Sequence, residues 1–92
     1  MIVSFKHKGL KVFFETGSTK GIQAKHAEKL QDILDRLDAV ECIEDMNAPG
    51  YMLHLLEPKK NSIYAVRVSG NWRVTFRMIV NKAEIVDYLD YH

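Results

Sequence analysis

Gly70-Asn71-Trp72-Arg73-Val74-Thr75-Phe76 is the stretch of sequence that decides the fold. After Gly70-Asn71, large apolar side chains at Trp72, Val74 and Phe76 alternate with polar ones. In an extended chain, this period of two puts the apolar side chains on one face and the polar side chains on the other. The stretch therefore predicts a half-buried antiparallel strand over residues 72–79, and Arg73 and Arg77 make its open face cationic.

Further strands are predicted on both sides of this stretch. Ile63 to Val68 is rich in β-branched and aromatic residues, and residues 69–71 supply the turn chemistry of a hairpin. A closing strand is expected from about Glu84 to Leu89, after a turn at Asn81-Lys82, and another from Tyr51 to Leu56. These segments predict a mainly antiparallel sheet.

The N-terminal half predicts one short strand and two helices. Met1 to Phe5 suits an opening strand, and Lys8 to Glu15 a first helix. Apolar residues at three- and four-residue steps predict an amphipathic helix from about Gln23 to Ala39. The expected fold is α+β: a short N-terminal strand and two helices packed on one face of a sheet of three to five strands, in one domain spanning residues 1–92. The other sheet face stays available.

Composition narrows the class of protein. The 92 residues, 47% of them hydrophobic, suffice for one small core. No apolar run approaches the roughly 20 residues that span a bilayer, and the first residues lack a secretion signal, so no membrane partner is expected. The single cysteine, Cys42, fits a reducing compartment. We expect a cytoplasmic protein.

The net charge of +1 is unevenly distributed along the chain. Residues 1–27 carry five lysines against one acid, and residues 58–92 six basic residues against three acids. Residues 28–57 carry eight acids against two basic residues. This asymmetry suggests an anionic partner for the two terminal segments, although small domains also carry such patches by chance.

Several kinds of site are disfavoured by the sequence. The four histidines and one cysteine show no metal-ligand spacing, and the five glycines form no phosphate-binding loop, so we expect neither a metal nor a cofactor. By residue type, His54 in its apolar strand suits a core or edge position, and the terminal His92 would ordinarily fray. His7 and His26 are expected on a surface and receive no role.

The sequence resembles the HigB branch of the RelE/ParE toxins, which are the toxin halves of bacterial toxin–antitoxin pairs. The resemblance covers nearly the whole chain. Its motifs are Ser4-Phe5-Lys6-His7-Lys8-Gly9-Leu10-Lys11, Leu53-His54, Asn71-Trp72-Arg73-Val74-Thr75-Phe76 and Asp90-Tyr91-His92. It implies a ribonuclease that cuts messenger RNA in the ribosomal A site. The positions that match the family's catalytic residues are His54, Arg73, Asp90, Tyr91 and His92.

The resemblance also implies partners. These are messenger RNA, the A site of the 70S ribosome and a HigA-like helix-turn-helix antitoxin, through which the toxin would reach operator DNA. The basic residues expected to contact RNA are Lys6, Lys8, Lys59, Lys60, Arg67 and Arg77. One position departs from the pattern: relatives often carry a lysine where this chain has Glu57, which leaves the lysine's role in doubt.

The chemistry of RNA cleavage suits these residue types. Without a metal, the substrate's own 2′-hydroxyl is the nucleophile, and the enzyme supplies a base, an acid and a donor to the phosphorane. Arginine matches two phosphorane oxygens, and histidine transfers protons near neutrality. The residues leave open whether Asp90 is a base or orients His92, and whether Tyr91 stacks on a base or donates a proton.

Two other functions are compatible with the sequence. A ParE-type toxin would poison DNA gyrase without a catalytic cluster, and an interaction domain would use its polar residues only as solvated surface. Primer extension on messenger RNA after brief induction distinguishes them, because only the nuclease produces translation-dependent cuts within coding sequence.

Overall fold

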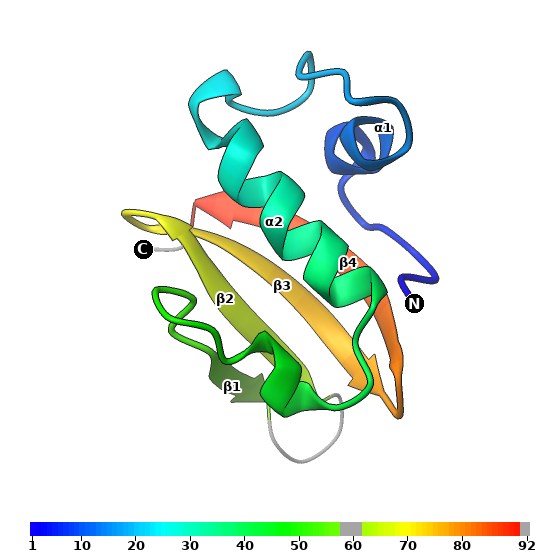
Figure 1. The fold of residues 1–92 in the computed structure, drawn as a ribbon. Coiled ribbons are helices and arrows are strands. Elements are labelled where there is room, and N and C mark those ends of the chain that lie inside the picture. The colour runs from blue at the N-terminus through cyan, green and yellow to red at the C-terminus, as the bar shows by residue number, and fades with distance from the viewer. Residues whose placement is uncertain (58–61, 91–92) are drawn as a thin grey trace.

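The alternating C-terminal segments form an antiparallel sheet. The computed structural model describes residues 1–57 and 62–90. Its strands are β1 (His54–Glu57), β2 (Ile63–Ser69), β3 (Trp72–Ile79) and β4 (Lys82–Asp90), and they lie in the order β1-β2-β3-β4 (Figure 1). Every neighbouring pair is antiparallel. The predicted α+β class and mainly antiparallel sheet are confirmed, and β3 has the predicted bounds.

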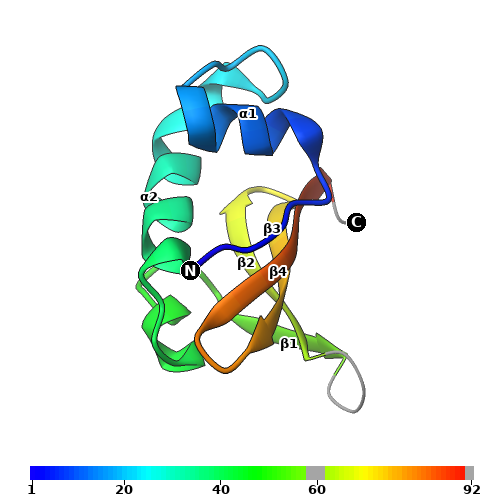
Figure 2. The same cartoon turned by 90° about the vertical axis from the view of Figure 1, so that its right-hand side faces the viewer.

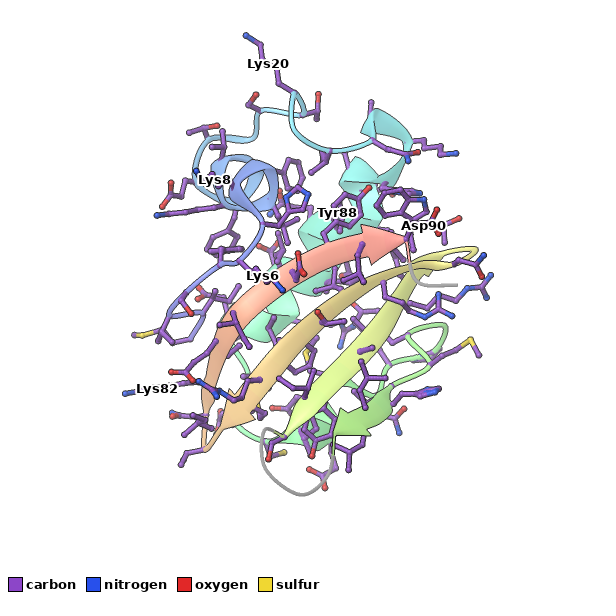
Figure 3. The ribbon with its side chains drawn as sticks, turned by 180° about the vertical axis from the view of Figure 1, so that it is seen from behind. Lys6, Lys8, Lys20, Lys82, Tyr88 and Asp90 are labelled. Atoms are coloured by element: carbon purple, nitrogen blue, oxygen red, sulfur yellow. The ribbon has the colours of Figure 1, made fainter. Side chains whose placement is uncertain are left out.

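The helices precede the sheet in the chain. They are α1 (Lys8–Thr16), the 3-10 turn η1 (Ala24–His26), α2 (Ala27–Asp38) and the 3-10 turn η2 (Ile43–Met46). α2 runs across one face of the sheet, and α1 lies across the end of α2 (Figures 1 and 2). Seen from behind, the sheet lies in front of α2, and no described helix covers this second face (Figure 3). Within residues 1–57 and 62–90, we find no helix long and apolar enough to cross a bilayer.

The core lies between α2, α1 and the covered face of the sheet. The apolar stripe of α2 supplies Leu30, Ile33, Leu34 and Leu37, and each is fully buried. Val66, Val74, Phe76 and Val86 meet them from β2, β3 and β4, also fully buried. The predicted alternation in β3 is therefore confirmed, because its buried residues are those at even positions.

Four segments differ from the prediction. The turn after β3 comes at residues 80–81 rather than 81–82, and β4 begins at Lys82 rather than Glu84. The expected strand at residues 1–5 is reduced to two isolated parallel bridges, from Ile2 to Ala83 and from Phe5 to Val86. β1 begins at His54 rather than Tyr51, because the positive φ of 49° at Met52 interrupts the extended chain. The helix predicted over 23–39 has a 3-10 first turn, η1, before the regular α2.

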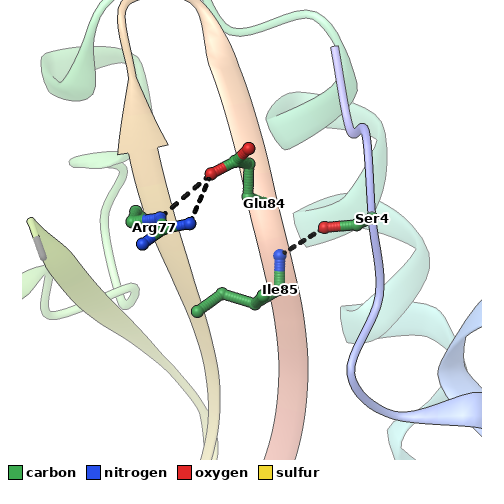
Figure 4. A network of polar contacts seen from close by, with 4 residues as sticks. All are labelled: Ser4, Arg77, Glu84 and Ile85. Atoms are coloured by element: carbon green, nitrogen blue, oxygen red, sulfur yellow. Dashed lines mark hydrogen bonds and ion pairs between the residues drawn. The ribbon is translucent and has the colours of Figure 1, made fainter.

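A bulge in β4 breaks its alternation. Thr75 pairs with Asp87 and Arg77 with Glu84, so β4 has one more residue than β3 between these two pairs. Ile85 takes up the extra residue with a φ of 47°, and the Ile85 N–H donates to Ser4 Oγ at 2.8 Å (Figure 4). The N-terminal segment therefore supplies the hydrogen bond that the bulge removes from the ladder.

Candidate active site

The open face of the sheet carries polar side chains in rows that cross the strands. Paired residues in an antiparallel ladder point to the same side, and Val66 pairs with Val74 on the covered face. The residues next to these two in each strand must therefore point to the open face. Two of the open-face rows are His54–Ala65–Thr75–Asp87 and Arg67–Arg73–Leu89, and Ile63–Arg77–Glu84 lies further along the strands.

Arg67 and Arg73 lie directly opposite each other in this pattern, and both side chains are half-buried. Like charges in this position repel each other, so an anion bound between them would stabilise the pair. Arg73 Nη1 donates to the backbone oxygens of Gly70 and Trp72, at 2.8 and 3.1 Å. These two bonds hold the Arg73 guanidinium against the β2–β3 turn. The pair is therefore suited to binding a phosphate group.

β4 ends at the same end of the sheet, but its last residue points to the covered side, as Trp72 does. Asp90 is the last residue of β4 and pairs with Trp72, the residue before Arg73. Figure 3 shows Asp90 and Tyr88 at this end of β4 and Lys82 at the other. We call Gly70, Trp72, Arg73 and Asp90 together the sheet corner. Two of the five predicted catalytic residues, Arg73 and Asp90, thus lie at the sheet corner although 17 positions separate them in the chain.

His54 lies on the open face but away from the sheet corner. Its side chain is exposed, and it pairs with Ala65 on the edge strand β1. Two strand spacings of about 4.8 Å separate β1 from β3, and His54 lies in the row of Thr75, two residues along β3 from Arg73, so the backbones of His54 and Arg73 are roughly 12 Å apart. A substrate between them can touch both. Tyr91 and His92, the other two predicted catalytic residues, lie outside the described residues.

The predicted RNA-binding residues have different surroundings. Lys6 and Lys8 are exposed near the outer edge of β4, where the Lys6 N–H donates to the Val86 carbonyl at 2.9 Å. Arg77 lies on the open face, but its Nε and Nη2 both contact Glu84 Oε1 at 2.9 Å (Figure 4). This ion pair neutralises Arg77, so Arg67 is the stronger candidate for RNA contact. Lys59 and Lys60 lie outside the described residues.

The part of the chain that the structure describes contains no group of three or more His, Cys, Asp or Glu side chains arranged to hold a metal ion. The described residues offer a guanidinium (Arg73) and a carboxylate (Asp90) at the sheet corner, and an imidazole (His54) elsewhere on the open face. A guanidinium stabilises anionic oxygens, and the other two groups transfer or position protons.

The prediction that His26 lies on the surface is wrong. Its side chain is 3% exposed, and its Nδ1 lies 2.6 Å from the Tyr88 hydroxyl. Burial, with a smaller contribution from the charge on Lys25, lowers the pKa of His26 below its usual value. The sequence did contain a signal, because His26 precedes Leu30 and Ile33 by four and seven positions and so shares their apolar stripe.

Comparisons with known proteins identify a toxin family over nearly the whole chain. A model of the family described as RelE-like toxin of type II toxin-antitoxin system HigB matches residues 3–92. A protein of Proteus vulgaris named Endoribonuclease HigB is 41% identical over 92 residues, which is 100% of both chains. An uncharacterized protein of Haemophilus influenzae is 34% identical over 90 residues, covering 96% of this chain and 88% of its own length. The similarity therefore includes every strand that builds the sheet corner.

Proposed function

This chain belongs to the RelE-like HigB toxins of type II toxin–antitoxin systems, and on that premise we propose that it is an endoribonuclease that cuts messenger RNA in the ribosomal A site. The full-length similarity to a protein named as an endoribonuclease is the observation that carries the activity. The ribosome as the place of cleavage follows from the family resemblance. We place its action in the cytoplasm, where messenger RNA is translated.

The proposed reaction is a transesterification within the RNA. The 2′-oxygen of one nucleotide attacks the adjacent phosphorus and gives its proton to a base on the enzyme. The bond from phosphorus to the 5′-oxygen of the next nucleotide breaks, and that oxygen takes a proton from an acid. The products are a 2′,3′-cyclic phosphate and a 5′-hydroxyl end. No water or redox partner enters this step.

Arg73 is proposed to stabilise the negative charge of the phosphorane. Its position supports this role, because bonds to Gly70 and Trp72 hold the guanidinium still before substrate arrives. A donor that is already in place needs no reorganisation during the reaction. The Arg67 side chain, directly opposite, binds a neighbouring phosphate or shares the same one.

Proton transfer is assigned to the remaining predicted residues. His54 and His92 are proposed for this role because an imidazole can both accept and donate a proton. Asp90 acts either as a base or by orienting His92, and Tyr91 stacks on a base or donates a proton. Asp90 lies at the same end of the sheet as Arg73, which supports a role for it near the reacting phosphate, and its pairing with Trp72 places its side chain on the covered side of that end.

Membership in a type II toxin family implies an antitoxin partner and an RNA target. We propose further that the antitoxin is a HigA-like helix-turn-helix protein, and that the pair binds operator DNA through it. Co-expression of a neighbouring helix-turn-helix gene should allow growth and yield a stable complex that shifts operator DNA. Continued toxicity in that co-expression would contradict the pairing.

A reconstituted translation system tests the proposed function. With purified ribosomes and one defined messenger RNA, the wild-type chain should cut within the coding sequence, and primer extension should map the cuts. The same RNA without ribosomes should stay intact, and Arg73→Ala should abolish the cuts. An uncut message together with inhibited DNA supercoiling would instead support the gyrase poison, which the similarity to an endoribonuclease does not favour.

A further inference from the structure

A cluster of four rings lies under the sheet corner, on the covered side of the sheet. Tyr88 of β4 is at its centre and is 4% exposed. Its ring centroid lies 4.7 Å from that of Trp72, 5.3 Å from that of His7 and 5.9 Å from that of His26. His26 also meets Trp72 edge-on at 5.6 Å. The cluster thus joins β4 and β3 to the starts of α1 and α2.

Tyr88 makes two hydrogen bonds through its hydroxyl. The Gln23 N–H donates to the hydroxyl oxygen at 3.4 Å, and the phenol proton can be donated to His26 Nδ1 at 2.6 Å in the tautomer that carries the imidazole proton on Nε2. This arrangement requires an unprotonated His26 Nδ1 as acceptor. Burial raises the pKa of Tyr88 and lowers that of His26, and both shifts favour this pair of neutral groups.

The cluster is directly connected to the sheet corner. Tyr88 precedes Asp90 by two residues in β4, so both lie on the same side of that strand. Trp72 stacks on Tyr88 and pairs with Asp90 across the ladder. Arg73 follows Trp72 and donates to the Trp72 carbonyl. These contacts connect Tyr88 to two residues of the sheet corner, to Asp90 along β4 and to Arg73 through Trp72.

We propose that His26 is a positioning residue: its hydrogen bond with Tyr88 fixes the end of β4 and so sets Asp90 relative to Arg73. This inference rests on the proposed function, since it concerns the same reaction. His26 does not touch the reacting atoms in this account, and its effect reaches them through Tyr88 and Trp72. Misplacement of catalytic groups by about 1 Å can cost about a hundredfold in rate. The hydrogen bond between His26 and Tyr88 can therefore affect the rate although neither residue touches the reacting atoms.

Two variants break the contact from either side. Tyr88→Phe removes only the hydroxyl and keeps the ring in its place, while His26→Leu removes the imidazole and keeps a buried apolar side chain. Each should lower kcat for ribosome-dependent cleavage by about tenfold or more, with little change in KM. The double variant should lose no more than either single one, because both remove the same interaction. His26→Asn, whose amide oxygen can accept the Tyr88 proton, should restore most of kcat.

Tyr51→Phe is the matched control. Tyr51 is also a buried tyrosine, 2% exposed, and its hydroxyl donates to Asp32 on α2; its backbone carbonyl accepts from the Arg67 N–H at 2.7 Å, a bond that the Tyr51→Phe variant keeps. This variant loses a comparable hydrogen bond and should lose comparable stability, yet keep the wild-type kcat. A role of His26 and Tyr88 in stability alone would give all three variants the same kinetics when folded.

Nuclear magnetic resonance gives a readout that does not depend on activity. The backbone order parameter of Asp90 should fall in Tyr88→Phe and His26→Leu, and stay at the wild-type value in Tyr51→Phe. An unchanged Asp90 order parameter, or a wild-type kcat in folded Tyr88→Phe, would overturn the inference. A wild-type chain that cuts no message would refute the proposed nuclease instead, and the order parameters would still decide whether His26 positions Asp90.

Discussion

Replacing Arg73 by alanine should separate catalysis from folding. The variant loses two bonds from Nη1 to the carbonyls of Gly70 and Trp72, each with a net value of about 0.5–1.5 kcal/mol. It also removes the repulsion with Arg67 directly opposite, which offsets about 0.2–1 kcal/mol. The free energy of unfolding should therefore fall by about 3 kcal/mol or less, against a typical total of about 5–15 kcal/mol.

The Arg73→Ala substitution should cost more free energy in transition-state stabilisation than in folding. Removing one preorganised donor to a developing anion costs about 10²–10³ in kcat, or about 2.7–4 kcal/mol. Arg73→Lys keeps the charge but not the planar fork, and it should recover only part of this loss. Arg67→Ala, which removes the same charge from the same row, should mainly raise KM.

The assay compares urea unfolding with single-turnover cleavage on programmed ribosomes at saturating toxin. Folded Arg73→Ala that keeps more than about a third of the wild-type kcat would refute the charge-stabilising role, because a donor to the phosphorane is worth far more. If Arg67→Ala lost as much kcat as Arg73→Ala, the two arginines would act together as a general cationic surface, and Arg73 would have no special role.

Three further predictions concern stability and binding. Val80, at the β3–β4 turn, has a φ of 55° and is 84% exposed, so Val80→Gly should gain about 0.5–1 kcal/mol by relieving strain, and calorimetry showing a lower Tm would contradict this. The pKa of His26 is lowered in the folded state, so the unfolded chain binds more protons below its ordinary value of about 6.5. Stability measured by urea unfolding should therefore fall as pH drops below about 6.5, and His26→Leu should flatten this fall; equal slopes in the two proteins would contradict the assignment. Affinity for programmed ribosomes, measured by filter binding, should drop steeply between about 50 and 200 mM salt, and a flat response would contradict phosphate contacts by the open face.

The sequence predicted a strand well where apolar and polar residues alternate without interruption. In β3 this alternation continues from Trp72 onward, and the strand has the predicted bounds, Trp72–Ile79. The β2–β3 turn was equally clear, because Gly70 adopts the positive φ of 57° that its turn position favours. Val80 occupies the same position in the β3–β4 turn with a side chain that disfavours it, which explains why that turn was predicted one residue too late.

The errors arose where tertiary contacts overrode local pattern. The bulge at Ile85 depends on Ser4, which is 81 positions away, so alternation counted along β4 alone does not reveal it. The same long-range contacts reduce the predicted opening strand to two bridges. His26 was misplaced because residue type suggested a surface, while its position on the apolar stripe of α2 indicated the core.

The candidate site was only partly predictable from physics. Alternation alone places Arg73 on the open face, and pairing with Arg67 follows from the hairpin. Nothing in the local sequence indicates that Asp90 ends opposite Trp72, since that register depends on the β4 bulge. The family resemblance supplied the set of residues, and the register explains how two of them come together.

The chemical nature of the RNA ends is the most direct test of the central claim. Message cut by the wild-type chain on purified ribosomes would be recovered, and the terminal groups of the fragments identified by mass spectrometry. We predict a 2′,3′-cyclic phosphate on the upstream fragment and a 5′-hydroxyl on the downstream one, with neither fragment present in the Arg73→Ala reaction. A 3′-hydroxyl paired with a 5′-phosphate, or full cleavage by Arg73→Ala, would contradict the mechanism at the sheet corner.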